Sequence, residues 1–319
     1  MTMTIAAIEK QYHHLATAGA YAEALALITR EGHRFPDYSQ DVVYYWRMLM
    51  ADHLNQSALV LQLLQQAVDA GHWYNSVELR SDFQALNGQP QFERLVERSA
   101  QRRTALIAGA VPVLKTLRPA HAPMPYPWLL ALHGGQSNVE SFAGHWMAAV
   151  AHGWFVALPQ SAQPFGPGNF TWNDWDWATL EVRQHVAAIC QQYPVDQQRS
   201  VAAGFSLGAG LALWLALNGA VKANGLILVA PFLPHVESLL PALDAGQGQG
   251  LRVYLVASDD DFYCLEVAHK LADLLPRYDI DTHLETYPKL GHSFPPPFES
   301  RVPAALDYVL GVGRDTRRD

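Results

Sequence analysis

The sequence has little charge. Asp, Glu, Lys and Arg make up only 16% of its 319 residues, whereas about 25% is usual for soluble proteins. Half of the residues are hydrophobic, which excludes an intrinsically disordered chain and predicts a large buried core. The net charge is −8. A nucleic-acid binder would carry a basic stripe, so nucleic acid is not an expected partner.

Cysteine is scarce as well. The two cysteines, Cys190 and Cys264, cannot form a disulfide framework and predict two buried thiols in a reducing compartment. Residues 1–10 contain neither the basic nor the apolar stretch of a signal peptide. These two observations predict a cytoplasmic protein.

One uncharged run raises the question of a membrane span. Residues 200–221 carry no charge and are numerous enough to cross a bilayer. The run nevertheless contains Ser200, Ser206, Asn218 and four glycines, and it includes the turn pattern discussed below. We therefore expect no membrane span.

Residues 1–105 have the periodicity of helices and almost no strand pattern. The pair Ala24-Leu25 recurs at Ala58-Leu59, and 58 − 24 = 34, which is the tetratricopeptide period. In this alignment Asn55 takes the position of Tyr21. Residues 79–96 resemble a capping segment. We predict a tetratricopeptide-like helical domain over 1–105, with an unspecific helical bundle as the alternative.

Residues 106–319 follow a different pattern, in which short apolar runs alternate with amphipathic helices. Strands that are apolar throughout and are separated by helices predict an α/β fold with a parallel sheet covered on both faces. The predicted strands are 113–117, 128–132, 154–158, 200–204, 225–230, 251–257 and 282–287, and the predicted helices are 176–193, 207–217, 264–275 and 302–310.

The segment Gly204-Phe205-Ser206-Leu207-Gly208 fits the pattern G-x-S-x-G. The pattern alone is weak, but an apolar strand precedes it and an Ala/Leu-rich helix follows it, which is the context of a nucleophile elbow. The glycines leave room for a tight turn that holds the Ser206 hydroxyl at a helix N-terminus, where negative charge is favoured. Ser206 is the predicted nucleophile.

A serine nucleophile needs a base, and the base needs an acid to orient it. His292 lies in a loop between the last strand and the last helix, where a base could reach the sheet edge. His235, His269 and His283 lie at less suitable places. Three aspartates follow the strand 251–257. Asp261 lies three residues after Ser258, the usual place of the acid, so it is favoured over Asp259 and Asp260, which we expect to be solvated turn residues that cap the next helix.

An oxyanion hole is predicted from two loops. The N–H of Leu207, directly after the nucleophile, is one expected donor. The glycines of His133-Gly134-Gly135 follow a strand and let the backbone approach a substrate. The second donor is the N–H of Gly135 or that of Gln136.

Residues 110–312 resemble an α/β-hydrolase, within the phospholipase/carboxylesterase and dienelactone-hydrolase group. The resemblance implies ester hydrolysis through a serine acyl-enzyme, without a cofactor. Dienelactone hydrolases use cysteine at the position of Ser206, which favours an esterase here. Ala209 stands where prolyl-oligopeptidase-type enzymes often have glycine. The matching residues are His133-Gly134-Gly135, Val195-Asp196-Gln197-Gln198-Arg199, Gly204-Phe205-Ser206-Leu207-Gly208, Asp261 and Gly291-His292.

An aromatic-rich loop follows the strand 154–158, and it is a candidate wall for the substrate pocket. Phe165, Trp172 and Trp175, together with Gln136, are the predicted pocket residues. The alternative is that these rings pack against the following helix. No metal-ligand spacing is present, since neither His13-His14 nor the three aspartates have partners at a useful distance in the sequence.

The sequence therefore predicts a serine carboxylesterase acting on small-molecule esters. Two alternatives stay open: a peptidase or acyl-aminoacyl hydrolase of the same fold, and a helical-repeat adaptor whose hydrolase domain binds a ligand. The helical domain is a candidate site for a protein or peptide partner.

Overall fold

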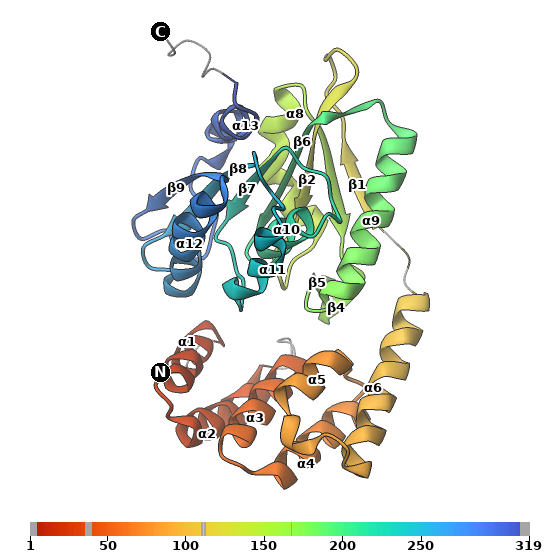
Figure 1. Ribbon diagram of the computed structural model, residues 1–319, viewed down its shortest axis with the longest axis vertical. Helices are drawn as coiled ribbons and strands as arrows, with labels where there is room; N and C mark the ends of the chain where they lie inside the picture. The colour runs from red at the N-terminus through yellow and green to blue at the C-terminus, as the bar shows by residue number, and fades with distance from the viewer. Residues whose placement is uncertain (1–4, 36–39, 110, 112, 167, 313–319) are drawn as a thin grey trace. The chain divides into compact units, whose positions relative to one another are not determined.

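The computed structural model describes residues 5–35, 40–109, 111, 113–166 and 168–312. The chain divides into two compact units (Figure 1). One comprises Met1–Ala110 and Phe165–Pro167, and the other comprises Val111–Pro164 and Gly168–Asp319. The first unit extends beyond residue 105 because its last helix continues to Gly109.

The first unit is helical. Each helix buries one apolar stripe, and helices adjacent in the sequence pack together from α1 to α4, after which α4 packs against α6. The helices are α1 (Ile5–Thr17), α2 (Tyr21–Glu31), α3 (Gln40–His53), α4 (Ser57–Asp69), α5 (Ser76–Asp82) and α6 (Pro90–Gly109).

Two helical hairpins in this unit repeat each other. In the α1–α2 turn the N–H of Ala20 donates to the carbonyl of Leu15, and in the α3–α4 turn the N–H of Gln56 donates to that of Ala51. Gly19 and Asn55 have left-handed φ values of +74° and +57°. Glycine and asparagine adopt this conformation most readily, and it closes a helix C-terminus. The offset is 55 − 19 = 36 residues.

The 34-residue alignment is therefore wrong in register. It pairs Ala24, which is buried, with Ala58, which is exposed. With the 36-residue offset the buried position of Ala24 corresponds to Val60, and that of Leu27 to Leu63. An Ala-Leu pair is common in helices, whereas the turn geometry and the buried stripe determine which positions are equivalent.

The second unit contains a seven-stranded sheet in the order β1-β3-β2-β6-β7-β8-β9. All neighbouring strands are parallel except β1 and β3. A separate two-stranded sheet joins β4 and β5. The strands are β1 (Val113–Leu117), β2 (Tyr126–Leu132), β3 (Phe155–Gln160), β4 (Gln163–Gly166), β5 (Asn169–Thr171), β6 (Val195–Phe205), β7 (Gly225–Val229), β8 (Arg252–Ser258) and β9 (Asp281–Tyr287).

Helices cover both faces of this sheet (Figure 1). Side chains alternate along β2, so Leu130 joins a core with α9, α10 and α12, whereas Leu129 joins a core with α8 and α13. The predicted α/β class is thereby confirmed. The helices are α7 (Val139–Phe142), α8 (Met147–Ala151), α9 (Trp175–Gln192), α10 (Leu207–Leu217), α11 (Leu240–Asp244), α12 (Phe262–Leu274) and α13 (Val302–Leu310). Within the described residues, no helix has the length and apolarity needed to cross a membrane.

Candidate active site

Ser206 lies in the turn between β6 and α10. Its backbone has φ +55° and ψ −123°, a strained conformation for a residue with a side chain. The turn is held from both sides, because the Ser206 N–H donates to Val229 at 2.9 Å and the Ser206 carbonyl accepts from Phe232 at 3.0 Å. These bonds keep the strained turn in place and present the hydroxyl at the first turn of α10.

The glycines on either side of Ser206 are required by close backbone contacts. A Cβ at Gly204 would lie 2.4 Å from the carbonyl oxygen of Gly208, and a Cβ at Gly208 would lie 2.3 Å from that of His133. Backbone atoms cannot move aside as a flexible side chain can. The G-x-S-x-G spacing thus reflects the contact of the elbow with itself and with the loop after β2.

Three of the predicted residues are joined by hydrogen bonds at the C-terminal ends of the strands. His292 Nε2 lies 2.9 Å from Ser206 Oγ, and His292 Nδ1 lies 2.6 Å from Asp261 Oδ2. The other histidines that the sequence offered lie elsewhere: His235 precedes a short helix, His269 is on α12 and His283 is in β9. In this arrangement the imidazole can accept the serine proton, and the carboxylate can stabilise the imidazolium that forms.

The loop that carries His292 is tied to the turn after β8. Three successive N–H groups of the loop are bound by three successive side chains: Lys289 donates to Asp259 Oδ1 at 2.7 Å, Leu290 to Ser258 Oγ at 3.1 Å and Gly291 to Asp260 Oδ1 at 2.7 Å. Asp259 and Asp260 are exposed turn residues, as the sequence predicted, but where caps of α12 were expected they bind this loop. Their carboxylates accept hydrogen bonds from the backbone N–H groups of a loop about 30 residues away.

The loop after β2 is organised around His133, whose side chain is fully buried. Its Nε2 accepts the Ser161 N–H at 3.2 Å, which leaves Nδ1–H to donate to the Gly134 carbonyl at 2.7 Å. Burial lowers the pKa of His133 to about 4, so the imidazole is neutral. The peptide unit that the Gly134 carbonyl shares with the Gly135 N–H is planar, so this bond also sets the direction of that N–H.

Gly135, which carries one expected oxyanion donor, lies beside the side chain of Leu207, which carries the other. A Cβ at Gly135 would lie 3.8 Å from Leu207 Cδ2. Within the described parts of the chain, no acceptor is bound by the N–H of Gly135 or of Leu207. Gln136, the alternative, has a left-handed φ of +59° and is exposed. Backbone N–H groups that bind no acceptor in the protein are the kind of donor that can bind a developing oxyanion.

Two of the predicted aromatic residues have their rings in packing contacts with neighbouring elements. The Trp172 side chain is fully buried, and its Nε1–H donates to the His133 carbonyl at 2.9 Å. Trp175 packs against Trp214 on α10, with ring centroids 5.6 Å apart. Phe165 lies in β4 and is grouped with the first unit. Trp172 thus supports the loop, and Trp175 packs a helix, as the alternative interpretation held.

Other aromatic rings lie beside the histidine, outside the four predicted pocket residues. Phe205 has its ring centroid 4.9 Å from that of His292 and stacks on Phe294 at 4.8 Å. Phe294 in turn stacks on His145 at 3.8 Å. A signal existed for two of them, because Phe205 directly precedes Ser206 and Phe294 is two residues after His292.

Comparison with solved structures establishes the fold. An uncharacterized protein from Bacillus cereus ATCC 10987 is 21% identical over 96% of this chain and 99% of its own, with a TM-score of 0.54. Esterase PE8 is 18% identical over 62% of this chain and 99% of its own, with a TM-score of 0.52. The acetyl xylan esterase from Paenibacillus sp. R4 is 16% identical over 63% of this chain and 80% of its own, with a TM-score of 0.50.

These identities show a shared α/β-hydrolase fold and nothing finer. The Bacillus cereus protein aligns over nearly the whole of this chain, so the likeness includes the helical unit. No protein-family model matches the sequence, and no curated protein matches it.

Proposed function

We propose that this protein is a serine carboxylesterase that hydrolyses small acyl esters. The observation that carries the proposal is the continuous hydrogen-bonded path from Ser206 Oγ through the His292 ring to Asp261 Oδ2, at a strained turn between strand and helix. Support for an ester substrate comes from two proteins of the same fold that are named as esterases.

The proposed reaction has two steps. Ser206 Oγ attacks the ester carbonyl while its proton passes to His292 Nε2, and Asp261 stabilises the imidazolium. The carbonyl oxygen becomes an oxyanion that binds the N–H groups of Gly135 and Leu207. His292 then protonates the departing alcohol, and a water molecule activated by the same histidine hydrolyses the acyl-enzyme.

Replacement of the nucleophile tests this proposal. In Ser206→Ala we expect kcat/KM for p-nitrophenyl acetate to fall by at least about 10⁴-fold, because no attacking oxygen remains. The circular dichroism spectrum should be unchanged. A fluorophosphonate should label Ser206 of the native protein, as read by mass spectrometry.

Ser300→Ala is a matched control, because Ser300 is an exposed serine whose hydroxyl donates to the Pro297 carbonyl. It should keep both activity and labelling. Undiminished turnover in Ser206→Ala would refute the proposal. The peptidase alternative has its own test: faster release of an aminoacyl chromophore than of p-nitrophenol would favour it.

For the helical unit we propose a tetratricopeptide-like repeat that binds a protein or peptide. The support is the helical hairpin repeated at an offset of 55 − 19 = 36 residues, two more than the tetratricopeptide period. Capture of a partner that depends on residues 1–105 and is indifferent to Ser206→Ala would support it, and would favour the adaptor interpretation if activity were absent.

A further inference from the structure

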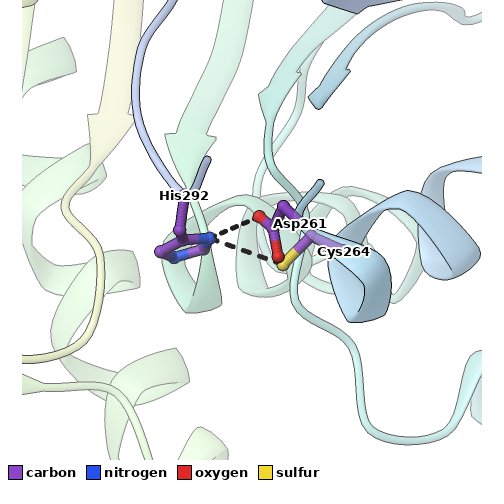
Figure 2. A group of neighbouring side chains, drawn as sticks. All are labelled: Asp261, Cys264 and His292. Atoms are coloured by element: carbon purple, nitrogen blue, oxygen red, sulfur yellow. Dashed lines mark hydrogen bonds and ion pairs between the residues drawn. The ribbon is translucent and has the colours of Figure 1, made fainter. Parts of the chain in front are cut away.

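Three side chains of different chemistry converge beside Ser206. Figure 2 shows that Cys264 faces the same histidine nitrogen as Asp261. Its Sγ lies 3.7 Å from His292 Nδ1, and the Asp261 carboxylate lies 2.6 Å from that nitrogen. One oxygen, one sulfur and one nitrogen lie within 4.8 Å of one another.

Cys264 belongs to the first turn of α12, three residues after Asp261. That spacing places both side chains on the same side of the helix. Cys264 is only 2% exposed, and burial together with the Asp261 carboxylate raises the pKa of its thiol. The thiol is therefore neutral, and the ester chemistry described above makes no use of it.

We propose that Asp261, Cys264 and His292 form an inhibitory site for a thiophilic divalent cation such as Zn²⁺. The proposal that binding inhibits rests on the proposed esterase function. Cysteine sulfur, imidazole nitrogen and carboxylate oxygen are the donors that zinc prefers, and three protein ligands leave a fourth position for water.

The distances suit such an ion after a small movement. Zinc ligands at about 2.0–2.3 Å from a tetrahedral centre lie about 3.3–3.7 Å from one another. The sulfur-to-nitrogen distance of 3.7 Å already fits, whereas the nitrogen-to-carboxylate distance of 2.6 Å must increase. The His292 side chain is 44% exposed, which gives the ion a route to the site.

The proposed inhibition follows from where the protons go. The cation takes the lone pair of His292 Nδ1, and the single ring proton then resides on Nε2. The Cys264 thiol releases its proton to solvent and binds as thiolate. His292 Nε2 then carries a hydrogen and donates to Ser206 Oγ instead of accepting its proton. The nucleophile is left without a base.

The experiment measures ester hydrolysis at increasing Zn²⁺ for four proteins: the native chain, Cys264→Ala, Cys264→Ser and Cys190→Ala. Each is compared with its own rate in the presence of a chelator. Cys190 is the matched control, since it is the other free cysteine and lies on α9. It is only partly buried, unlike the buried thiol that the sequence predicted.

We expect Zn²⁺ to inhibit the native protein and Cys190→Ala equally, and the chelator to restore both. The two Cys264 variants should need at least about tenfold more Zn²⁺ for half-inhibition, because a ligand is lost. Mg²⁺, which prefers oxygen ligands, should not inhibit. Equal inhibition of native protein and a folded Cys264 variant would overturn the proposal. Cys264→Ser keeps the test valid if the smaller alanine unfolds the protein.

A second readout does not depend on esterase activity. Co²⁺ bound by the native protein should show a thiolate-to-cobalt charge-transfer absorption that is retained in Cys190→Ala and lost in both Cys264 variants. Its presence without esterase turnover would support the metal site and refute the proposed function. Its absence from an active native protein would overturn the metal site alone.

Discussion

The two halves of the candidate site are held in place by different forces. The nucleophile half, made of the β6–α10 elbow and the His133–Gly135 loop, is buried or half-buried. Its backbone segments approach each other so closely that a Cβ added at Gly208 would lie 2.3 Å from a carbonyl oxygen. The histidine half, made of the turn after β8 and the His292 loop, lies nearer the surface. There, side-chain oxygens hold successive N–H groups of a loop.

This difference indicates how each half should respond to change. Steric constraints in a packed interior leave no room for relaxation, so a small addition is costly. Hydrogen bonds near the surface are worth less, because water competes for their donors and acceptors. We therefore expect mutations in the nucleophile half to affect stability, and mutations in the histidine half to affect mainly catalysis.

The largest effect is expected for Gly208→Ala. The added methyl would collide with the carbonyls of Leu132 and His133, so the free energy of unfolding should fall by more than about 3 kcal/mol and activity should be lost. Urea unfolding measures the first and ester hydrolysis the second. Gly144→Ala is the matched control, because nothing lies within 4 Å of a Cβ there. Native-like stability of Gly208→Ala would contradict the view that steric constraints hold the nucleophile half in place.

The second-largest effect is expected at acid pH, which should destabilise the nucleophile half through His133. Below about pH 6.5 His133 takes a proton in the unfolded chain, whereas in the folded chain burial lowers its pKa to about 4. Stability is therefore complete above pH 6.5 and is lost as the pH falls towards 4, by about 3 kcal/mol. Urea unfolding between pH 7 and pH 4.5 measures this loss. His133→Asn does not titrate there, so an equal loss in that variant would contradict the assignment.

The smallest effect is expected for Asp260→Ala, which removes the acceptor for the Gly291 N–H and the Ser258 hydroxyl. The His292 loop should loosen, and kcat/KM should fall about tenfold, equivalent to about 1.4 kcal/mol. The free energy of unfolding should change less, because Asp260 is exposed. Asp260→Asn keeps an acceptor oxygen and should retain most activity. Wild-type kcat/KM in Asp260→Ala would show that this bond does not position His292.

The sequence predicted the fold class and the approximate bounds of the long helices in residues 106–319. The helices 207–217 and 302–310 were expected with the bounds that α10 and α13 have. Apolar periodicity is a local property, so it identifies such segments well. The short elements, such as the strands β4 and β5 and the helix α8, have too few residues for any period to show.

The candidate site could be predicted where the pattern and the chain order are informative. Ser206, Asp261 and His292 were chosen by pattern and by their position after strands, and the structure places them within hydrogen-bond distance. The pocket residues were harder to predict from the sequence. A tryptophan in a Gly-rich loop fits a pocket wall and a buried support equally well, and only packing shows that Trp172 is the latter.

By itself, the sequence determined that the chain has a helical part followed by an α/β part, and that a serine stands in a strand-turn-helix context. These properties follow from local preference and periodicity. Only the tertiary structure decided the 36-residue register of the hairpins, the use of Asp259 and Asp260 by a distant loop, and the meeting of Cys264 with His292. Such contacts join residues far apart in the sequence, and their geometry arises only when the strands are brought into one sheet.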